Sequence, residues 1–253
     1  MFDDLGTRVA VPARVARVVS LVPSLSESVA ATAPALLVGA TDWCPADLDV
    51  PRVGGTKNPL VERVLGLFPD VVLANEEENR LSDLDAMRAA GLAVWVTRVR
   101  GVDEAFTSLH RMLTLACRVD RPAWLDNAAA AWAAVQPGRP RTAVVPIWRR
   151  PWMVLGRDTF AGDVLARLGV RNAFADAPDR YPRRRLDDLH GTELVVLPDE
   201  PYAFSATDGP ECFANQEVAL VSGRHLTWYG PSLVEAPAVL AAQLAATLPR
   251  GHT

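Results

Sequence analysis

The stretch Arg121–Val135, RPAWLDNAAAAWAAV, lies near the middle of the 253-residue chain and organises the segments on either side of it. Alanine is a strong helix former, and Pro122 suits a first helical turn. The apolar residues recur at helical spacing and form one stripe: Trp124, Leu125, Ala128, Trp132 and Val135. The run QPGRP then predicts the end of a helix about 22 Å long.

Strands and helices alternate on both sides of this helix. Apolar strands are expected before it at 17–22, 36–40, 71–74 and 92–97, and after it at 142–147, 153–155 and 193–197. Near the C-terminus the pattern favours a helix over Phe213–Leu220 and a last strand over Gly223–Leu226. Ser24 or Ser26 is the expected N-cap of the first helix.

This alternation predicts an α/β protein with parallel sheets built from βα units. We expect two lobes with a ligand cleft between them and one helix joining them. The expected boundaries are 1–117 for the N-terminal lobe, 118–138 for the linking helix and 139–253 for the C-terminal lobe.

Composition excludes several classes of protein. Hydrophobic residues make up 49% and charged residues 22%, as in an ordinary globular chain. The net charge of −4 leaves no basic footprint for nucleic acid. The longest apolar runs fall short of the roughly 18 residues of a membrane span, so no membrane insertion is expected. The N-terminus has no signal-peptide core, which predicts a cytoplasmic protein as written, or an extracytoplasmic one if a leader was removed.

Motifs of catalysis and of resident metals are missing from the sequence. It contains no GxSxG, P-loop or GxGxxG, and its three cysteines lie far apart. The histidines form no pair at metal-ligand spacing: His110, His190, His225 and His252. We therefore expect no catalytic residue, no metal site and no covalently bound cofactor.

Large aromatic residues gather in the loops that follow the predicted strands, where parallel sheets bind ligands. They offer flat faces to a planar apolar ligand, although each of them could simply cover a sheet edge: Trp43, Trp148, Trp152, Tyr181, Trp228 and Tyr229. The densest charge feature is the run Glu76-Glu77-Glu78. It could bind a metal or a cationic ligand, or form a solvated turn.

Several segments together resemble the helical-backbone periplasmic-binding-protein-like family, the substrate-binding proteins of ABC importers for cobalamin, ferric siderophores and haem. They are RVVSLVPSLSESVAA (17–31), LLVGATDW (36–43), PRVGGTKNPLVERVLGLFPDVVLA (51–74) and GRDTFAGDVLARLGVRNAFAD (156–176). The resemblance covers about residues 15–248 in the right order and is strongest to the cobalamin-binding members. It implies two α/β lobes joined by one long helix and no catalytic activity.

The resemblance also implies roles for particular residues. Trp43, Trp148 and Tyr181 would contact the ligand as cleft aromatics. The remaining cleft walls would be lined by Thr56, Lys57, Asn58, Asn75, Glu76, Glu78, Trp228 and Tyr229. Glu62 and Asp187 match the acidic residues that pair with arginines of an ABC permease; the alternative is that both are ordinary exposed helix charges.

The first interpretation is a monomeric, non-catalytic binder of a metal chelate, above all cobalamin or another corrinoid, with an ABC permease as candidate partner. A ferric siderophore or haem is the alternative ligand. A second hypothesis is a cytoplasmic metal-handling protein or enzyme that reuses the scaffold, with Glu76–Glu78, His225 and Asp42 as working groups. A third is an interaction module with an empty cleft.

Overall fold

A computed structural model describes residues 1–45 and 47–248, and this part of the chain divides into two compact units. Unit 1 comprises Met1–Val99, Asp103–Asp126 and Tyr229–Pro231. Unit 2 comprises Arg100–Val102, Asn127–Trp228 and the described residues from Ser232 onward. The division falls inside helix α5 (Ala123–Ala133), the helix predicted at 121–135.

Unit 1 is built on a four-stranded parallel sheet with the order β2-β1-β5-β6. Its strands are short and almost wholly buried, as parallel strands between two layers of helices require: β1 (Val18–Ser20), β2 (Leu37–Ala40), β5 (Val71–Asn75) and β6 (Val94–Thr97). A small antiparallel hairpin accompanies the sheet: β3 (Gly54–Gly55) and β4 (Asn58–Pro59).

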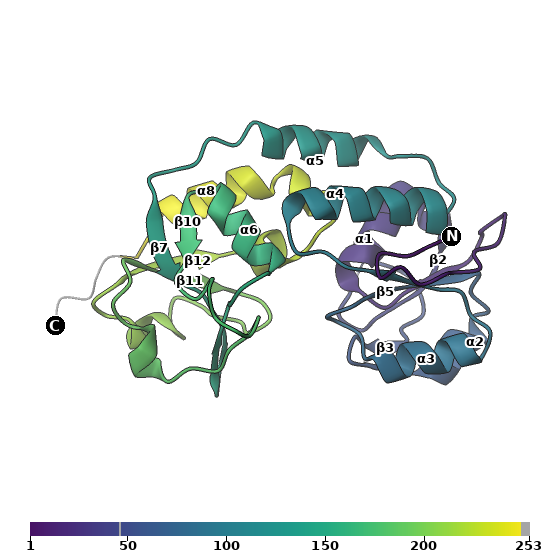
Figure 1. Cartoon of the computed structure of the whole chain (residues 1–253), viewed down its shortest axis with the longest axis horizontal. Helices are drawn as coiled ribbons and strands as arrows, with labels where there is room; N and C mark the ends of the chain where they lie inside the picture. Colours follow the sequence, from purple (N-terminus) through teal and green to yellow (C-terminus); the bar gives the residue numbers. More distant parts are fainter. Residues whose placement is uncertain (46, 249–253) are drawn as a thin grey trace. The chain divides into compact units, whose positions relative to one another are not determined.

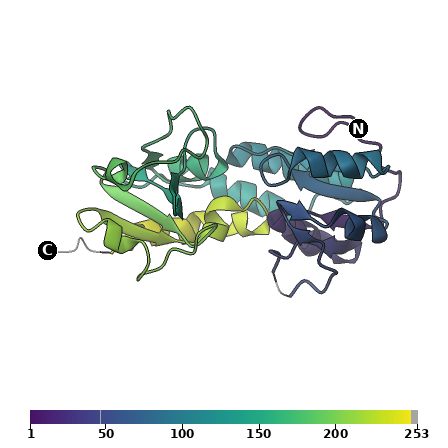
Figure 2. The ribbon, with the colours of Figure 1, turned by 90° about the horizontal axis from the view of Figure 1, so that it is seen from below.

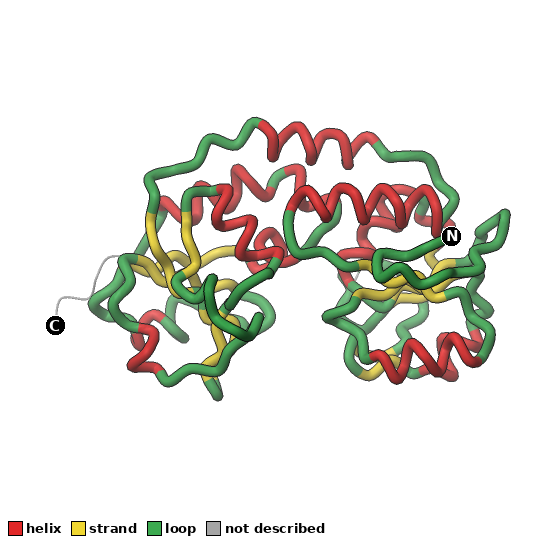
Figure 3. The backbone as a smooth tube through the Cα atoms, in the orientation of Figure 1, coloured by secondary structure: helices red, strands yellow, loops and turns green. Residues whose placement is uncertain are grey.

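Helices cover both faces of this sheet (Figures 1 and 3). One face carries α1 (Pro23–Thr32) and α4 (Val102–Arg111), which continues into a π-helical turn at Met112–Ala116. The other carries α2 (Val61–Gly66) and α3 (Leu81–Ala89). The core on that side is aliphatic and is formed by Val19, Leu21, Val53, Val64, Val72, Leu84, Met87, Val94 and Val96, among others.

Unit 2 repeats the strand order in a second four-stranded parallel sheet, β10-β7-β11-β12. The strands are β7 (Arg141–Val144), β10 (Val170–Asn172), β11 (Leu194–Pro198) and β12 (Glu217–Val221). In each sheet the strand that comes first in the sequence, β1 or β7, lies inside the sheet, and the next one, β2 or β10, lies at its edge. The strand order therefore reverses at the same place in both sheets. Helix α8 (Ala236–Ala245), yellow in Figure 2, lies alongside these strands, and Figure 1 shows it on the side that also carries α6 (Phe160–Arg167).

On the other face of unit 2, aromatic side chains and short 3-10 helices (Leu186–Leu189 and Pro210–Cys212) take the place of α-helices. The antiparallel hairpin β8 (Pro146–Arg149) and β9 (Trp152–Val154) lies there. Trp152 stacks on Phe204 with ring centroids 6.1 Å apart and meets Phe213 edge-on at 5.7 Å. Together with Val144, Val195 and Leu197 these rings form the apolar core of this side.

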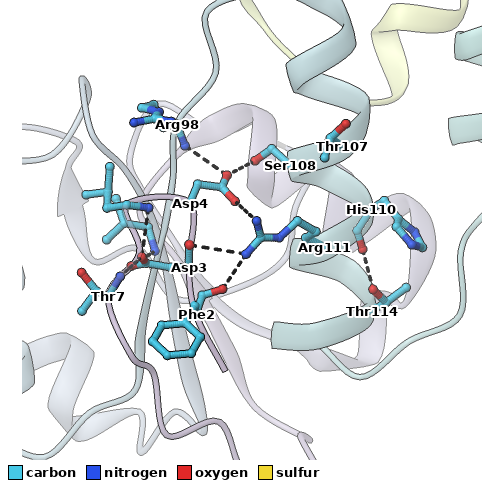
Figure 4. Close-up of polar contacts among 12 residues, drawn as sticks. Phe2, Asp3, Asp4, Thr7, Arg98, Thr107, Ser108, His110, Arg111 and Thr114 are labelled. Carbon is cyan, nitrogen blue, oxygen red and sulfur yellow. Dashed lines mark hydrogen bonds and ion pairs between the residues drawn. The ribbon is translucent and has the colours of Figure 1, made fainter.

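The N-terminal arm covers the outer edge of β6 in unit 1. Its amide at Asp4 donates to the carbonyl of Val96 at 3.2 Å, which extends the sheet by one short contact. The carboxylate of Asp4 accepts from Ser108 of α4 and lies 3.6 Å from Arg111, as Figure 4 shows. The arm therefore protects a strand edge that would otherwise be open to pairing.

Four local predictions are wrong. The single strand expected at 142–147 is divided, because β7 ends at Val144 and the following residues belong to β8 of the antiparallel hairpin. The predicted helix Phe213–Leu220 contains the start of β12, whose apolar run pairs in register with β11 and is largely buried. The predicted strand Gly223–Leu226 belongs to helix α7 (Gly223–Thr227), where polar Arg224 and His225 suit a short, half-buried helix better than a buried strand. Ser24 and Ser26 are not caps, because Val22 holds the cap position and both serines are buried inside α1.

The stripe on α5 is confirmed, although the helix is shorter than predicted at both ends. Leu125 and Ala128 are fully buried and Trp132 is nearly so. None of the described helices has the length and hydropathy needed to span a membrane. The exact lobe limits, the cleft between the lobes and the monomeric state stay predictions.

Candidate functional site

Both sheets reverse their strand order between the first and third strands along the chain, that is, between β1 and β5 and between β7 and β11. In doubly wound sheets, ligands bind beyond the carboxyl ends of the strands at such a reversal. The segments that follow these strands are therefore the place to look in each unit. In unit 1 they are the loop after β2, hairpin β3–β4 and the turn after β5.

Hairpin β3–β4 connects an exposed tryptophan to the turn after β5. Trp43 is 70% exposed, and its indole nitrogen lies 3.2 Å from the position that a Cβ on Gly55 would take. On the other side, the backbone carbonyl of Thr56 accepts a hydrogen bond of 2.9 Å from the side-chain amide of Asn79. Lys57 donates through its ammonium group to the backbone carbonyl of Glu77. Through these contacts the hairpin links the exposed ring of Trp43 to the polar turn after β5 in unit 1.

The turn Asn75–Asn79 is held in place by its own two asparagines. The side-chain oxygen of Asn75 accepts from the backbone N–H groups of Glu77 at 2.8 Å and Glu78 at 3.3 Å. The side-chain oxygen of Asn79 accepts from the backbone N–H of Asn75 at 2.8 Å. The Asn75 amide also donates to the carbonyl of Thr97 at the end of β6, at 3.0 Å. Because both asparagines are buried, these bonds fix the course of the backbone and hence the origin of each glutamate side chain.

Two titratable groups of this region have shifted pKa values. Burial raises the pKa of the half-buried Glu78 carboxyl to about 7; nearby Lys57 lowers it, and Glu77 raises it further. Tyr229 belongs to unit 1 although it comes from near the end of the chain. Burial, and secondly the charge of Glu78, raise the pKa of the Tyr229 phenol well above its usual value, against the effect of Thr97. Glu76 and Asn58, by contrast, are exposed.

In unit 2 the sequence-predicted aromatics separate into different environments. Trp148 is 42% exposed and meets Tyr202 edge-on at 5.7 Å, beside the chain reversal of the sheet. Tyr181 is exposed, and the guanidinium of Arg180 lies 6.0 Å from its ring centre. Trp152 instead packs into the apolar core of the unit. Trp148 and Tyr181 thus offer accessible rings, whereas Trp152 covers the sheet.

Trp228 is tied to an acidic residue that sequence reasoning does not single out. Its indole N–H donates to the Glu200 carboxylate at 3.0 Å. Burial raises the pKa of Glu200, and the hydrogen bond from Trp228 opposes that shift. Glu200 follows β11 directly, so its place after a buried strand is the signal that could have found it.

A pocket of about 470 Å³ lies elsewhere in unit 2, along one side of α6 and next to β10. None of the sequence-predicted ligand residues lines it. Its polar lining residues include Arg157, Asp158, Thr159, Asp163, Arg171 and Asn172.

Among the described residues, those of the metal-handling hypothesis are not grouped as a metal centre requires. His225 accepts or donates at both ring nitrogens, to Ser222 at 2.8 Å and to Glu235 at 3.0 Å. Asp42 and Glu76–Glu78 belong to unit 1, whereas His225 belongs to unit 2. Within residues 1–45 and 47–248, no group of three or more His, Cys, Asp or Glu side chains is arranged to hold a metal ion. His252 lies outside the described residues.

The two residues matched to permease docking are both on short helices. Glu62 is exposed in the first turn of α2. Asp187 is exposed in the 3-10 helix Leu186–Leu189, with its carboxylate 3.3 Å from Arg185. Exposure is what docking requires, and it is equally what ordinary surface charges show, so their role stays a prediction.

Comparison with known proteins identifies the fold. No protein-family model matches the chain. The chain is 23% identical over 185 residues to the vitamin B12-binding protein of Vibrio cholerae serotype O1, a match that spans 68% of this chain and 66% of that protein, just under two thirds of its length. Because identity is low and coverage partial, this relative suggests a function without establishing it.

Solved structures match over nearly the whole chain. Ceue of Helicobacter pylori with Ni(II) bound gives a TM-score of 0.80 at 14% identity, covering 96% of this chain and 88% of that one. A periplasmic heme-binding protein from Pseudomonas aeruginosa gives 0.69 at 23% identity, covering 93% and 95%. The predicted resemblance is thus confirmed for the fold: the chain has the α/β fold of the class III periplasmic binding proteins. The neighbours carry different ligands, so the fold alone does not name the ligand.

Proposed function

We propose that this chain, which has the fold of the class III periplasmic binding proteins, is a non-catalytic substrate-binding protein that takes a corrinoid such as cobalamin. The observation that carries the proposal is the exposed Trp43 beside the hydrogen-bonded turn Asn75–Asn79, at the ligand-binding edge of the unit 1 sheet. The vitamin B12-binding relative supports the choice of a corrinoid.

The ligand would stack on the indole ring of Trp43 and bury apolar surface there, and a few fixed polar groups would set the orientation of the ligand. An indole left 70% exposed buries its apolar face only when something covers it. The neighbouring turn has its backbone held by Asn75 and Asn79, so polar groups there are positioned before the ligand arrives. Trp148 and Tyr181, exposed on unit 2, are the further aromatic contacts we propose.

Direct titration tests this function. Purified protein is expected to shift the visible spectrum of cyanocobalamin and to gain thermal stability with it. Trp43→Ala is expected to weaken binding about tenfold or more, the loss of one large stacked face. Phe68→Ala is the matched control, because Phe68 is 79% exposed but lies before β5, at the opposite edge of the sheet.

Haem and a ferric siderophore complete the panel of ligands. If haem alone stabilises the protein, the haem-binding alternative replaces the corrinoid. If none of the three ligands shifts the spectrum or the melting temperature, the binding function is wrong.

Delivery to an ABC permease is part of the same proposal, with Glu62 and Asp187 as the docking acids and an extracytoplasmic location, as the neighbours are described as periplasmic. Both side chains are exposed. Glu62→Arg and Asp187→Arg should leave cyanocobalamin binding unchanged and abolish ligand-dependent uptake with the permease. Glu104→Arg, which changes an exposed charge of α4, is the control.

A further inference from the structure

Two aromatic rings of unit 2 meet where the strand order of its sheet reverses. Trp148 belongs to hairpin β8–β9, which follows β7, and Tyr202 belongs to the segment that follows β11. Strands β7 and β11 are parallel neighbours. The two rings therefore come from the two adjacent loops that a doubly wound sheet uses to bind its ligand. They meet edge to face, with ring centroids 5.7 Å apart and ring planes at 80° to each other.

The ring of Tyr202 is held by the core behind it. Its centroid lies 4.6 Å from that of Phe204, which is 4% exposed and itself stacks on Trp152. A row of rings thus runs outward from the core of unit 2 to Trp148, which is 42% exposed. Because aromatic pairs prefer particular mutual orientations, each ring restricts the next one. The exposed ring of Trp148 consequently rests on a ring that is anchored in the core.

The phenol group of Tyr202 is anchored as well. Its O–H donates to the carboxylate of Asp208 at 2.7 Å. Asp208 lies close enough because the chain turns back on itself there: the backbone N–H of Ser205 donates to the carbonyl of Asp208 at 3.0 Å, and the reverse bond measures 3.3 Å. Asp208 also forms an ion pair with Arg149, the residue next to Trp148 on β8.

Arg149 attaches the segment after β11 to hairpin β8–β9. Its side chain is 14% exposed and pairs with Glu211 as well as with Asp208. Its guanidinium carbon lies 5.7 Å from the ring centre of Trp152. Solvent ions screen partly buried ion pairs much less than exposed ones. Two consecutive residues of β8, Trp148 and Arg149, therefore contact the same segment at two points.

We propose that Tyr202 is a positioning residue of the ligand site, which together with Asp208 and Arg149 holds the ring of Trp148 in the orientation that binds the corrinoid. The proposal rests on the function proposed above and names residues of the same site that act through Trp148. A side chain that rotates freely loses conformational entropy when a ligand immobilises it, and this loss weakens binding. A ring that already rests on Tyr202 loses less, so the contact between the two rings raises affinity.

A double-mutant cycle on Trp148 and Tyr202 tests the proposal, with the affinity for cyanocobalamin measured by spectral titration. Trp148→Ala should weaken binding about tenfold and Tyr202→Ala about fivefold. The double variant should bind no more weakly than Trp148→Ala, because Tyr202 acts through the ring that is already missing. Effects that multiply, to about fiftyfold in the double variant, would mean that Tyr202 acts independently of Trp148 and would overturn the positioning role.

A conservative variant and a control separate positioning from general loss of stability. Tyr202→Phe keeps the ring and removes the bond to Asp208, so it should weaken binding about twofold and also serves if Tyr202→Ala does not fold. Phe174→Ala removes another half-buried ring packed against the same core, and it should lower the melting temperature and leave the affinity unchanged. Equal losses of affinity in Phe174→Ala and Tyr202→Ala would contradict the proposal.

Fluorine NMR of protein labelled with fluorotryptophan reports on the ring without any ligand. The resonance of Trp148 is identified by its absence from Trp148→Phe, and that of Trp43 by its absence from Trp43→Phe. Tyr202→Ala and Tyr202→Phe should both shift the Trp148 resonance, because its neighbouring ring is lost or released, and both should leave the Trp43 resonance of unit 1 in place. An unshifted Trp148 resonance would show that Tyr202 does not control this ring.

The outcomes distinguish this proposal from the one on which it rests. If cyanocobalamin binds equally well to the wild type and to the Tyr202 variants, the positioning role is wrong and the corrinoid function stands. Absence of any corrinoid binding overturns both proposals.

Discussion

Asn79 donates from its side-chain amide to the backbone carbonyl of Thr56 at 2.9 Å, and this bond joins the turn after β5 to hairpin β3–β4. The bond therefore holds side by side two segments that are separated in the sequence by more than a full βα unit. Both carry residues that sequence reasoning assigns to a ligand site. The consequences of removing this and other contacts can be measured.

Asn79→Ala should lower the free energy of unfolding by about 2 kcal/mol, because it removes bonds to Leu21 and Thr56 and leaves the buried N–H of Asn75 without its acceptor. Urea denaturation of the two proteins measures the difference. Asn215→Ala is the control, because Asn215 is exposed, and it should stay within about 0.5 kcal/mol of the wild type. Equal effects of the two substitutions would contradict the anchoring role.

Glu78→Gln should change how stability depends on pH. The folded-state pKa of about 7 lies above the ordinary glutamate value of 4.5, so the native state binds the proton more tightly than the unfolded state. The associated stability is fully present below pH 4.5 and is lost as pH rises through 7. At about pH 8 the free energy of unfolding of the glutamine variant should therefore exceed that of the wild type by about 2 kcal/mol, and this difference should disappear near pH 5. The figure is smaller than the pKa shift alone would give, because the carboxyl is partly exposed to solvent.

The matched variant Glu76→Gln serves as the control for this pH series, since Glu76 is an exposed residue of the same turn. Its difference from the wild type should remain within about 0.5 kcal/mol at both pH values. A Glu78→Gln curve parallel to the wild-type curve across this range would show that burial of the carboxyl has no energetic effect.

Two tryptophans should separate stability from binding. Trp132 is 3% exposed and donates to the carbonyl of Leu233 at 3.0 Å, so Trp132→Phe should cost about 1–2 kcal/mol of unfolding free energy. Trp43→Phe should change stability by less than about 0.5 kcal/mol and retain part of the corrinoid affinity, because a flat ring remains. Thermal melts with and without cyanocobalamin measure both quantities. A destabilising Trp43→Phe would mean that this ring is structural.

Gly156→Ala and Gly66→Ala should change the free energy of unfolding in opposite directions. A Cβ on Gly156 would lie 2.2 Å from the Asp179 carbonyl oxygen and 2.9 Å from that of Arg180, both backbone atoms, so about 3 kcal/mol or more should be lost. A Cβ on Gly66, at the end of α2, would meet nothing within 4 Å, and alanine there should add about 0.5 kcal/mol. Chemical denaturation tests the pair. Tolerance of Gly156→Ala would mean that the Asp179–Arg180 segment moves freely.

Much of the fold follows from local patterns in the sequence. Apolar runs bounded by turn residues locate β1, β2, β5, β6 and β11, and the apolar stripe with its QPGRP stop locates α5. The errors fall where local signals are weak. Phe213, Val218 and Leu220 allow a helical interpretation of the segment before α7, and only pairing with β11 decides for a strand.

The candidate site is predictable only in part, for a physical reason. The position of Trp43 and Asn75 after buried strands singles them out from the sequence alone. In the structure both lie at the edge of the unit 1 sheet where the carboxyl ends of its strands meet. Nothing local distinguishes Trp148, which is exposed, from Trp152, which fills a core that helices cover in the other unit. Likewise, the contact between Lys57 and Glu77 depends on how hairpin β3–β4 folds back. The ligand-binding roles themselves stay predictions.

Unit 1 is not continuous in the chain, because Tyr229–Pro231 complete it from the far end. A ribosome makes the chain from the N-terminus, so a nascent polypeptide must pass through all of β7 to β12 before the residue beside Ser24 and Thr97 exists. Until then the first sheet can form, but the environment that shifts Tyr229 and Glu78 cannot. The protein therefore acquires this corner of its candidate site only late in synthesis, after the strands of both sheets have been made.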